Sequence, residues 1–499
     1  MKAKHALSPR PFGLRDKIGY LLGDFGNDFT FILSSSFLLK FYTDVMGVSA
    51  GIVGLVMMFA RFVDAFTDVT MGRICDKSKI TRAGKFKPWL RRMCAPVAIS
   101  SFLMYQSALA DRAMWFKVAW LVVTYLLWGS IFYTTVNIPY GSMASAISAD
   151  PSDRQSLSTY RSMGATLAGV IIGAGIPMLV YKKEIVNGVP QSVMQGRAFT
   201  LVAGVFSLFA VGAYLLCYYL TTERVTPAVH PEKQNRNSIG KLLQNAFKNR
   251  ALLSIIVASI VMLLAQLTMQ QMANYVFPNY YNQPEAQTVS TLAMMIGMLI
   301  AAGIAKPLST KYGKAEISVA SNLLAGASCL ALFLLRPQNV WFFVALQFVC
   351  WFGLGVFSMV SWALITDVID YSELKNGIRE DGSIYALYSF ARKLGQAGSS
   401  GLVGLLLTLI GYSESTAFNP SVLRGIYTIA TLLPAIGFIL LALVLWFWYP
   451  LHKKQVDKNV KKLQKLHKAA QTADANPASD AANGIEEGII QERKHKNKK

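Results

Sequence analysis

The sequence predicts an all-α polytopic membrane protein of twelve transmembrane helices, arranged as two pseudo-symmetric halves of six helices each. Three observations support this fold class. Of the 499 residues, 53% are hydrophobic and only 15% are charged, a composition typical of helical membrane proteins. The hydrophobic residues form twelve stretches long enough to cross a bilayer. One long polar interruption divides these stretches into two sets of six.

The predicted spans follow one another in order, with polar loops between them. Two of them are longer than a bilayer requires, so we expect these helices to tilt or to end in water. The spans lie near residues 18–42, 51–73, 89–109, 116–148, 162–181, 199–221, 251–281, 287–308, 316–336, 340–368, 384–411 and 424–449. The resulting parts are a cytoplasmic N-terminus (1–17), an N-terminal bundle (18–221), a cytoplasmic linker (222–250), a C-terminal bundle (251–449) and a basic cytoplasmic tail (450–499).

The distribution of Lys and Arg predicts which side of the membrane each loop faces. The net charge is +22, and the basic residues crowd into the loop at 73–92 but are absent from the loop at 42–50. Cytoplasmic loops carry such an excess, next to anionic lipid. We therefore expect a multi-pass protein of the inner or plasma membrane with both termini cytoplasmic and no nucleic-acid partner. The external loop at 181–198, with three basic residues, departs from this rule.

Histidine and cysteine usage argues against a metal site. All five histidines lie outside the predicted spans, and the five cysteines show no C-x-x-C spacing. A buried proton carrier would therefore have to be a carboxylate. The sequence also contains no nucleophile–base pattern, Walker loop or dinucleotide fingerprint, so we predict neither an enzyme nor a bound cofactor.

The second span carries three charged residues on one face. Arg61, Asp64 and Asp68 are three, four and seven positions apart, so they project together from an α-helix. Unpaired ionised groups at this depth would cost about 8–10 kcal/mol together on insertion scales, so the face must line a bundle interior or a water-filled cavity. An Arg–Asp pair that only joins two helices is one explanation. The second acid favours a cation site instead, because one Arg neutralises only one of the two carboxylates and leaves the second carboxylate for a cation.

The fourth span offers further oxygen ligands. Thr134 and Asn137 precede Pro139, which frees a backbone carbonyl. A small hard cation prefers several oxygen ligands. If the second and fourth spans touch, Asp64, Asp68, Thr134 and Asn137 could bind the coupling ion, H⁺ or Na⁺.

Other polar residues within the spans suit a sugar. Carbohydrates pack their C–H surface on aromatic rings and bond their hydroxyls to carboxylates, amides or Arg. The seventh span also presents a polar face suited to hydroxyl groups, with Gln266, Gln270, Gln271, Asn274 and Tyr275. The predicted sugar-binding residues from the other spans are Asn27, Asp28, Asn137, Arg161, Trp362, Tyr388 and Lys393.

Several motifs together resemble a known family. They are Gly23-Asp24-Phe25-Gly26-Asn27-Asp28, Arg61-x-x-Asp64-Ala65-x-x-Asp68, Gly84-Lys85-Phe86-Lys87-Pro88-Trp89, Asn137-Ile138-Pro139-Tyr140-Gly141-Ser142, Asp367-Val368-Ile369-Asp370-Tyr371 and Arg392-Lys393-Leu394-Gly395-Gln396. Over nearly all of residues 15–450 the chain resembles the glycoside–pentoside–hexuronide:cation symporters, the melibiose permease family of the major facilitator superfamily. The Asn-Ile-Pro-Tyr-Gly-Ser form is more similar to its glucuronide and xyloside carriers.

The resemblance implies roles for individual residues. Asp64 and Asp68 would bind the cation with Thr134, Asp28 would bind sugar hydroxyls, and Lys393 would be the essential lysine facing the cation site. Asn137 stands where melibiose permease has an aspartate shared by cation and sugar, which leaves one negative charge fewer. The resemblance also implies a cytoplasmic gating network of Arg73, Asp76, Asp367, Asp370, Glu373 and Arg379.

The predicted function is symport of a glycoside, pentoside or hexuronide with H⁺ or Na⁺ by alternating access, in a protein that works as a monomer among membrane lipids. A lipid-type symporter on the same scaffold is one alternative, disfavoured by Asp28 and the glutamines of the seventh span. A membrane sensor or channel is another. Asymmetric buried charges in a pseudo-repeated chain disfavour a pore.

Overall fold

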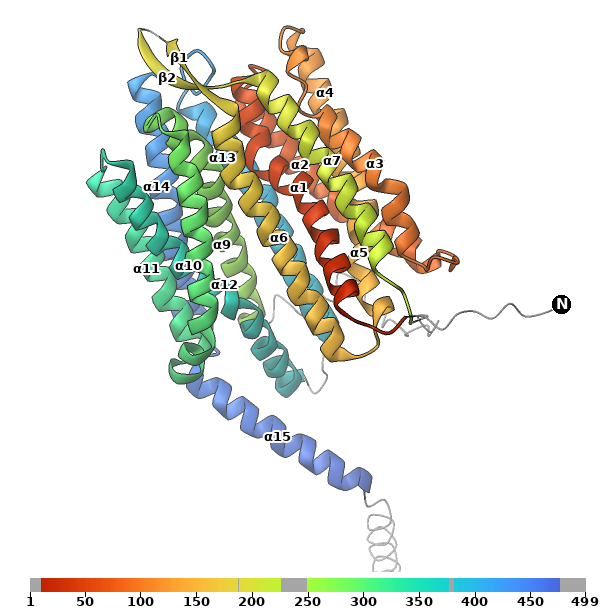
Figure 1. Cartoon of the computed structure of the whole chain (residues 1–499). Helices are drawn as coiled ribbons and strands as arrows, with labels where there is room; N and C mark the ends of the chain where they lie inside the picture. Colours follow the sequence, from red (N-terminus) through yellow and green to blue (C-terminus); the bar gives the residue numbers. More distant parts are fainter. Residues whose placement is uncertain (1–9, 187, 226–248, 377–380, 476–499) are drawn as a thin grey trace, which may run out of the picture.

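The computed structural model describes residues 10–186, 188–225, 249–376 and 381–475, and it is almost entirely helical (Figure 1). The N-terminal half comprises α1 (Leu14–Asp44), α2 (Ala50–Lys77), α3 (Lys87–Leu103), η1 (Ser107–Leu109), α4 (Met114–Leu126), η2 (Leu127–Tyr133), α5 (Thr134–Ile147), α6 (Pro151–Val180), β1 (Tyr181–Val186), β2 (Val189–Met194) and α7 (Gly196–Leu220). The C-terminal half comprises α9 (Arg250–Tyr275), η3 (Val276–Tyr280), α10 (Pro284–Tyr312), α11 (Lys314–Leu335), α12 (Val340–Asn376), α13 (Asp381–Leu409), α14 (Pro420–Leu443) and η4 (Val444–Trp448), followed by α15 (Lys453–Ala475).

Nine helical segments within the described residues are long and apolar enough to cross a membrane. One of them, Met114–Ile147, joins α4, η2 and α5 into a single span. The other three predicted spans correspond to α1, α3 and α13. α3 has only 17 residues, and α1 and α13 contain charged side chains that lower their hydropathy. The count of twelve membrane spans therefore stays a prediction.

The predicted external loop at 181–198 contains a β-hairpin that the sequence analysis missed. Its strands β1 and β2 pair antiparallel, with Tyr181 opposite Met194. Figure 1 shows this hairpin at one end of the bundle and α15 at the other. We call these the hairpin end and the tail end. The Ser192 amide donates to Asn282 Oδ1 at 2.7 Å, so the hairpin also joins the two halves.

Small residues let the two halves approach closely. On α2 and α13, a Cβ added to Gly404 would lie 2.4 Å from the Ala50 carbonyl oxygen, and one added to Gly54 would lie 2.7 Å from the Ser400 carbonyl oxygen. Only glycine fits such backbone contact, which is common where membrane helices cross. On the other side of the bundle, the Thr288 hydroxyl of α10 donates to the Ala174 carbonyl of α6 at 2.7 Å.

A buried lysine closes the hairpin end. Lys40 on α1 is only 1% exposed, and its Nζ lies 2.6 Å from Asp44 Oδ2, one turn further along the helix. The same ammonium donates across the interface to Asn279 Oδ1 at 2.6 Å and to the Tyr412 hydroxyl at 2.7 Å. The Tyr412 hydroxyl in turn donates to Asp44 Oδ1 at 2.8 Å. We call Lys40, Asp44, Asn279 and Tyr412 the Lys40 cluster; it holds the two halves together.

At the tail end, ion pairs hold each half together separately. In the N-terminal half, the fully buried Asp16 carboxylate pairs with Arg10 at 2.9 Å and with Arg224 at 2.8 Å. In the C-terminal half, Lys314 at the start of α11 pairs with Asp367 of α12 at 2.6 Å. The hydrogen bonds described above that cross between the halves lie towards the hairpin end, and these pairs do not cross.

Candidate functional site

A π-helical segment shapes the fourth span where it faces α2. Residues 127–133 form η2, a π-helical segment with i→i+5 hydrogen bonds between α4 and α5. Such segments are rare inside α-helices and occur frequently at functional sites. Here the segment brings two hydroxyl groups, on Ser130 and Thr134, to the charged face of α2. Thr134 also donates to the Gly129 carbonyl at 3.2 Å, which stabilises the junction.

The two acids of the second span each accept hydrogen bonds from this segment. The Ser130 hydroxyl donates to Asp64 Oδ1 at 2.6 Å, and the Thr134 hydroxyl donates to Asp68 Oδ1 at 2.9 Å. Arg61 lies 3.4 Å from Asp64 Oδ2. The Asp64 side chain is 13% exposed, whereas Phe66 on the opposite side of α2 is 77% exposed. The charged face of α2 therefore points into the molecule.

The second carboxylate has a partner from the other half of the protein. Lys393 on α13 forms an ion pair with Asp68 Oδ2. The sequence analysis left this second acid for a cation; in this structure an ammonium from a helix far away in the sequence pairs with it, and its role in cation binding stays a prediction. The Lys393 side chain is 40% exposed and the Asp68 side chain 22%, so solvent reaches this pair.

These groups surround a cavity of about 210 Å³ between α1, α2, the fourth span and α13, which we call the ionic cavity. Its lining includes all four predicted cation ligands, Asp64, Asp68, Thr134 and Asn137. It is completed by Phe31, Arg61, Tyr133, Lys393 and Gln396. The Arg61 guanidinium lies 4.9 Å from the Phe31 ring centroid, so this ring forms one wall. The sequence analysis missed Ser130. The available signal was a polar hydroxyl next to Gly129 within an otherwise apolar span.

Within the described residues, no group of three or more His, Cys, Asp or Glu side chains is arranged to bind a metal ion. Besides the two carboxylates, the lining of the ionic cavity contains two residues with a hydroxyl group, Tyr133 and Thr134, and two with an amide, Asn137 and Gln396. This set suits a proton or a single alkali cation better than a tightly held divalent metal.

The predicted sugar-binding residues of the N-terminal half lie on α1 and α6. Arg161 pairs with Asp24, its Nε lying 3.0 Å from Asp24 Oδ1. Asp24 precedes Asp28 by one helical turn on α1 and was not among the predicted sugar-binding residues. Asp28 itself is half-buried one turn further along. Asn27 is buried and accepts a hydrogen bond from the Tyr214 hydroxyl at 2.7 Å, while its amide donates to Asn137 Oδ1 at 3.5 Å.

The predicted aromatic residues lie together in the C-terminal half. The Trp362 and Tyr388 rings are in edge contact, with centroids 5.2 Å apart. The Arg392 guanidinium lies 5.6 Å from the Trp362 ring. Tyr388 is fully buried, whereas Trp362 is 43% exposed. Lys393 follows Arg392 directly, so α13 links this pair to the ionic cavity.

The predicted gate residues are spread over the tail end. Arg73 and Asp76 are exposed on α2, and the Lys85 ammonium donates to the Asp76 carbonyl at 3.0 Å. Asp367 pairs with Lys314 of the same half. Asp370 and Glu373 follow on α12, and Arg379 lies outside the described residues. The gating role of these residues stays a prediction.

Comparisons with known proteins agree on the kind of protein. A family model described as MFS/sugar transport protein matches residues 19–453. The chain is 31% identical over 458 residues to the glucuronide carrier protein homolog of Escherichia coli K12, covering 92% of this chain and 97% of the relative. It is 30% identical over 487 residues to the putative glycoside/cation symporter YagG of the same organism, covering 94% and 98%.

Solved structures support the fold. A bacterial homolog of the human lysosomal transporter Spinster, solved in an inward-facing and unoccupied conformation, superimposes with a TM-score of 0.61 at 11% identity. The match covers 90% of this chain and 97% of that one. At so low an identity the likeness concerns the fold alone.

Proposed function

We propose that this chain, a transporter that belongs to the glycoside/hexuronide:cation symporters of the major facilitator superfamily, takes up a glycoside, pentoside or hexuronide together with H⁺ or Na⁺. The observation that carries the proposal is the ionic cavity, where two carboxylates, a hydroxyl and an amide meet a lysine from the other half. We further propose that twelve helices span the inner membrane and that the tail end, with both termini, is cytoplasmic.

In the proposed mechanism the Lys393 ammonium neutralises Asp68 across the interface between the halves when no coupling ion is bound. A cation that binds Asp64, Asp68 and Thr134 neutralises the same carboxylate, and Lys393 then leaves it. Cation binding thereby changes which contacts hold the halves together. Coupling requires this, because a ligand shifts a conformational equilibrium only if it binds one state better than the other.

The sugar would bind between the halves on the tail-end side of the ionic cavity. Asp28 with the Asp24–Arg161 pair would supply charged hydrogen-bonding groups, and Trp362 an aromatic face. Asn27 and Asn137 connect this region to the cation ligands, since their amides are within hydrogen-bonding distance. Asn137 carries no charge, so the cation site has two carboxylates only.

Alternating access would follow from rocking of the two halves. Apart from the Lys393–Asp68 ion pair, the described hydrogen bonds that join them lie towards the hairpin end, whereas the Asp16 and Asp367 pairs stay within one half each. This arrangement supports a state closed on the outside. Opening to the outside would require the Lys40 cluster to separate.

Uptake into vesicles with imposed gradients tests the proposal. Vesicles containing the full chain are given labelled methyl β-D-glucuronide or methyl β-D-xyloside, with a Na⁺ gradient and a pH gradient applied separately. We expect accumulation above the external concentration with one of the two gradients. Equal uptake with and without both gradients would reduce the protein to a facilitator, and no uptake above protein-free vesicles would exclude these sugars as substrates.

A further inference from the structure

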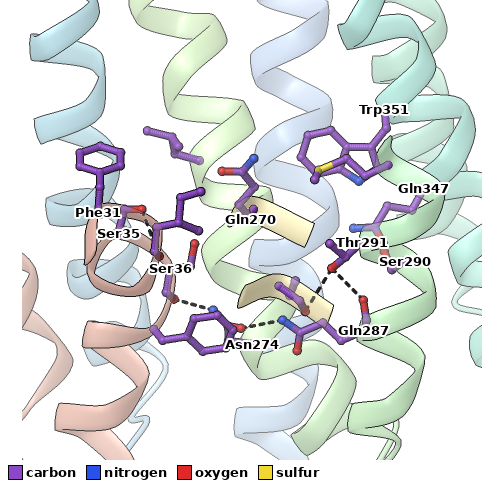
Figure 2. Close-up of a pocket in the computed structure, with 17 residues that line it drawn as sticks. Phe31, Ser35, Ser36, Gln270, Asn274, Gln287, Ser290, Thr291, Gln347 and Trp351 are labelled. Atoms are coloured by element: carbon purple, nitrogen blue, oxygen red, sulfur yellow. Dashed lines mark hydrogen bonds between the residues drawn. The ribbon is translucent and has the colours of Figure 1, made fainter. Parts of the chain in front are cut away.

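A second cavity of about 210 Å³ lies between the halves, next to the ionic cavity (Figure 2). α1, α6, α9, α10 and α12 contribute to its wall. Phe31 lines both cavities, so the two are neighbours. Each of the 17 residues that line the second cavity is uncharged, and amides and hydroxyls make up much of its polar surface. We call it the amide cavity.

A chain of hydrogen bonds fixes the orientation of two of its amides. The Asn274 Nδ2 donates to the Ser36 backbone carbonyl at 2.5 Å. Because a carbonyl can only accept, the other end of the Asn274 amide must be its oxygen. That oxygen accepts a hydrogen bond of 2.7 Å from the Gln287 Nε2. The Gln287 oxygen is therefore directed away from Asn274.

This Gln287 oxygen has no hydrogen-bond partner among the described residues. Gln287 is 5% exposed, and Figure 2 shows its side chain at the wall of the cavity. A buried carbonyl oxygen without a donor is unfavourable, and such groups are uncommon in native structures. The amide cavity therefore contains an acceptor that a bound molecule could satisfy.

A second amide offers the complementary donor. The Ser290 hydroxyl donates to Gln347 Oε1 at 2.6 Å, which orients the Gln347 Nε2 away from Ser290. Gln347 is 3% exposed and lines the cavity. Trp351, one turn further along α12, adds an aromatic ring to the same wall (Figure 2). The cavity thus presents an acceptor, a donor and an aromatic ring.

These features match the chemistry of a neutral sugar ring. A hydroxyl group both donates and accepts, and the C–H face of a sugar packs on an aromatic ring. A charged ligand is disfavoured, because no charged side chain of the lining would compensate it. The volume is roughly that of seven water molecules in the liquid, which suits one small ring and no more.

We propose that the amide cavity is a carbohydrate subsite that binds a neutral, hydroxyl-bearing ring, with Gln287 and Gln347 as its hydrogen-bonding groups and Trp351 as its packing surface. The inference rests on the proposed function, because it assigns a second subsite to the same substrate class. Its position beside Phe31 lets a neutral ring bind one side-chain width from the cation ligands.

Cysteine protection tests occupancy without any transport. The five native cysteines are buried, so Ser35→Cys in the cavity wall and Ser413→Cys in an exposed loop serve as site and control. The purified full-length variants are labelled with N-ethylmaleimide in detergent, with and without methyl β-D-xyloside or methyl β-D-glucuronide. We expect the neutral xyloside to slow labelling of Ser35→Cys, the charged glucuronide to slow it less, and neither to affect Ser413→Cys. No slowing by the xyloside would mean that the cavity does not bind a neutral sugar ring and would overturn the subsite.

A second variant tests the hydrogen-bonding wall itself. Gln287→Met keeps the volume but removes both polar atoms, so in the Ser35→Cys background the half-protecting glycoside concentration should rise about tenfold. Gln283→Met, an exposed glutamine preceding the same helix, should leave it unchanged. An unchanged value in Gln287→Met would overturn the proposal.

This test is independent of the proposed function, because the labelling uses neither gradient nor flux. Protection with the expected Gln287→Met shift but without gradient-driven uptake would support the subsite and refute symport. Gradient-driven uptake without protection of Ser35→Cys would support symport and refute the subsite.

Discussion

The ionic cavity and the amide cavity have equal volumes of about 210 Å³ and share the Phe31 ring, yet their chemistry is opposite. The first contains two carboxylates, an arginine and a lysine, whereas each residue lining the second is uncharged. Charge within a membrane is costly unless it is paired. The pairing of Arg61 with Asp64 and of Lys393 with Asp68 meets that requirement.

The difference indicates a division of tasks. Paired charges can exchange a partner, which is what coupling to an ion requires. Oriented amides cannot change charge, but they distinguish hydroxyl groups by direction. We therefore infer that ion coupling and recognition of a neutral ring take place in two neighbouring cavities that share Phe31. Three predictions test this separation.

The largest effect is expected from removing a carboxylate of the ionic cavity. Asp64→Cys or Asp68→Cys removes a cation ligand and leaves Arg61 or Lys393 without its partner. Concentrative uptake should be abolished in vesicles under an imposed Na⁺ or pH gradient, while the amount of protein in the membrane is retained. Asp111→Cys, an exposed loop residue, serves as the control. Undiminished accumulation in both cavity variants would refute the cation site.

A charge placed in the amide cavity should destabilise the protein. Gln347→Glu adds a buried carboxylate with no cation among the lining residues, at a cost of about 3 kcal/mol if it stays ionised. The midpoint of thermal unfolding in detergent should fall by several degrees at neutral pH. Gln283→Glu, exposed before α10, should leave the midpoint unchanged. Equal midpoints for both variants would show that the amide cavity tolerates charge.

The smallest effect is expected at the π-helical segment. Ser130→Ala removes one hydrogen bond to the Asp64 carboxylate, and hydrogen bonds to charged groups contribute about 1.5–3 kcal/mol. The cation concentration for half-maximal uptake should change about tenfold or more, with similar uptake at saturating cation. Ser145→Ala, which faces outward on the same span, should behave as wild type. If only the sugar concentration for half-maximal uptake changed, Ser130 would act on sugar binding and not on the cation ligands.

Much of the fold could be predicted from the sequence, because hydrophobic length and the central polar linker set the helical segments. The convergence of Asp64, Asp68, Thr134 and Asn137 on one cavity also follows the helical spacing. The π-helical segment and the hairpin could not be predicted, since their conformations depend on packing with other elements. The pairing of Arg161 with Asp24 could not be predicted either, because Asp28 lies one turn further along the same helix and could have been the partner.

Lys40 illustrates a signal that was present but not used. Lysine and aspartate four residues apart in an apolar span indicate an intrahelical pair. The partners of that pair, Asn279 on η3 and Tyr412 after α13, lie close to it only in the folded chain.

The Lys40 cluster has a consequence for how the hairpin end can open. One ammonium serves three oxygen atoms from both halves, and one of these partners, Tyr412, also serves the same carboxylate. Separating Asn279 and Tyr412 from Lys40 would therefore admit solvent to a cation and an anion together, with no stable halfway arrangement. We therefore expect the hairpin end to have two states: closed, with the Lys40 cluster intact, and open, with Lys40 and Asp44 both hydrated.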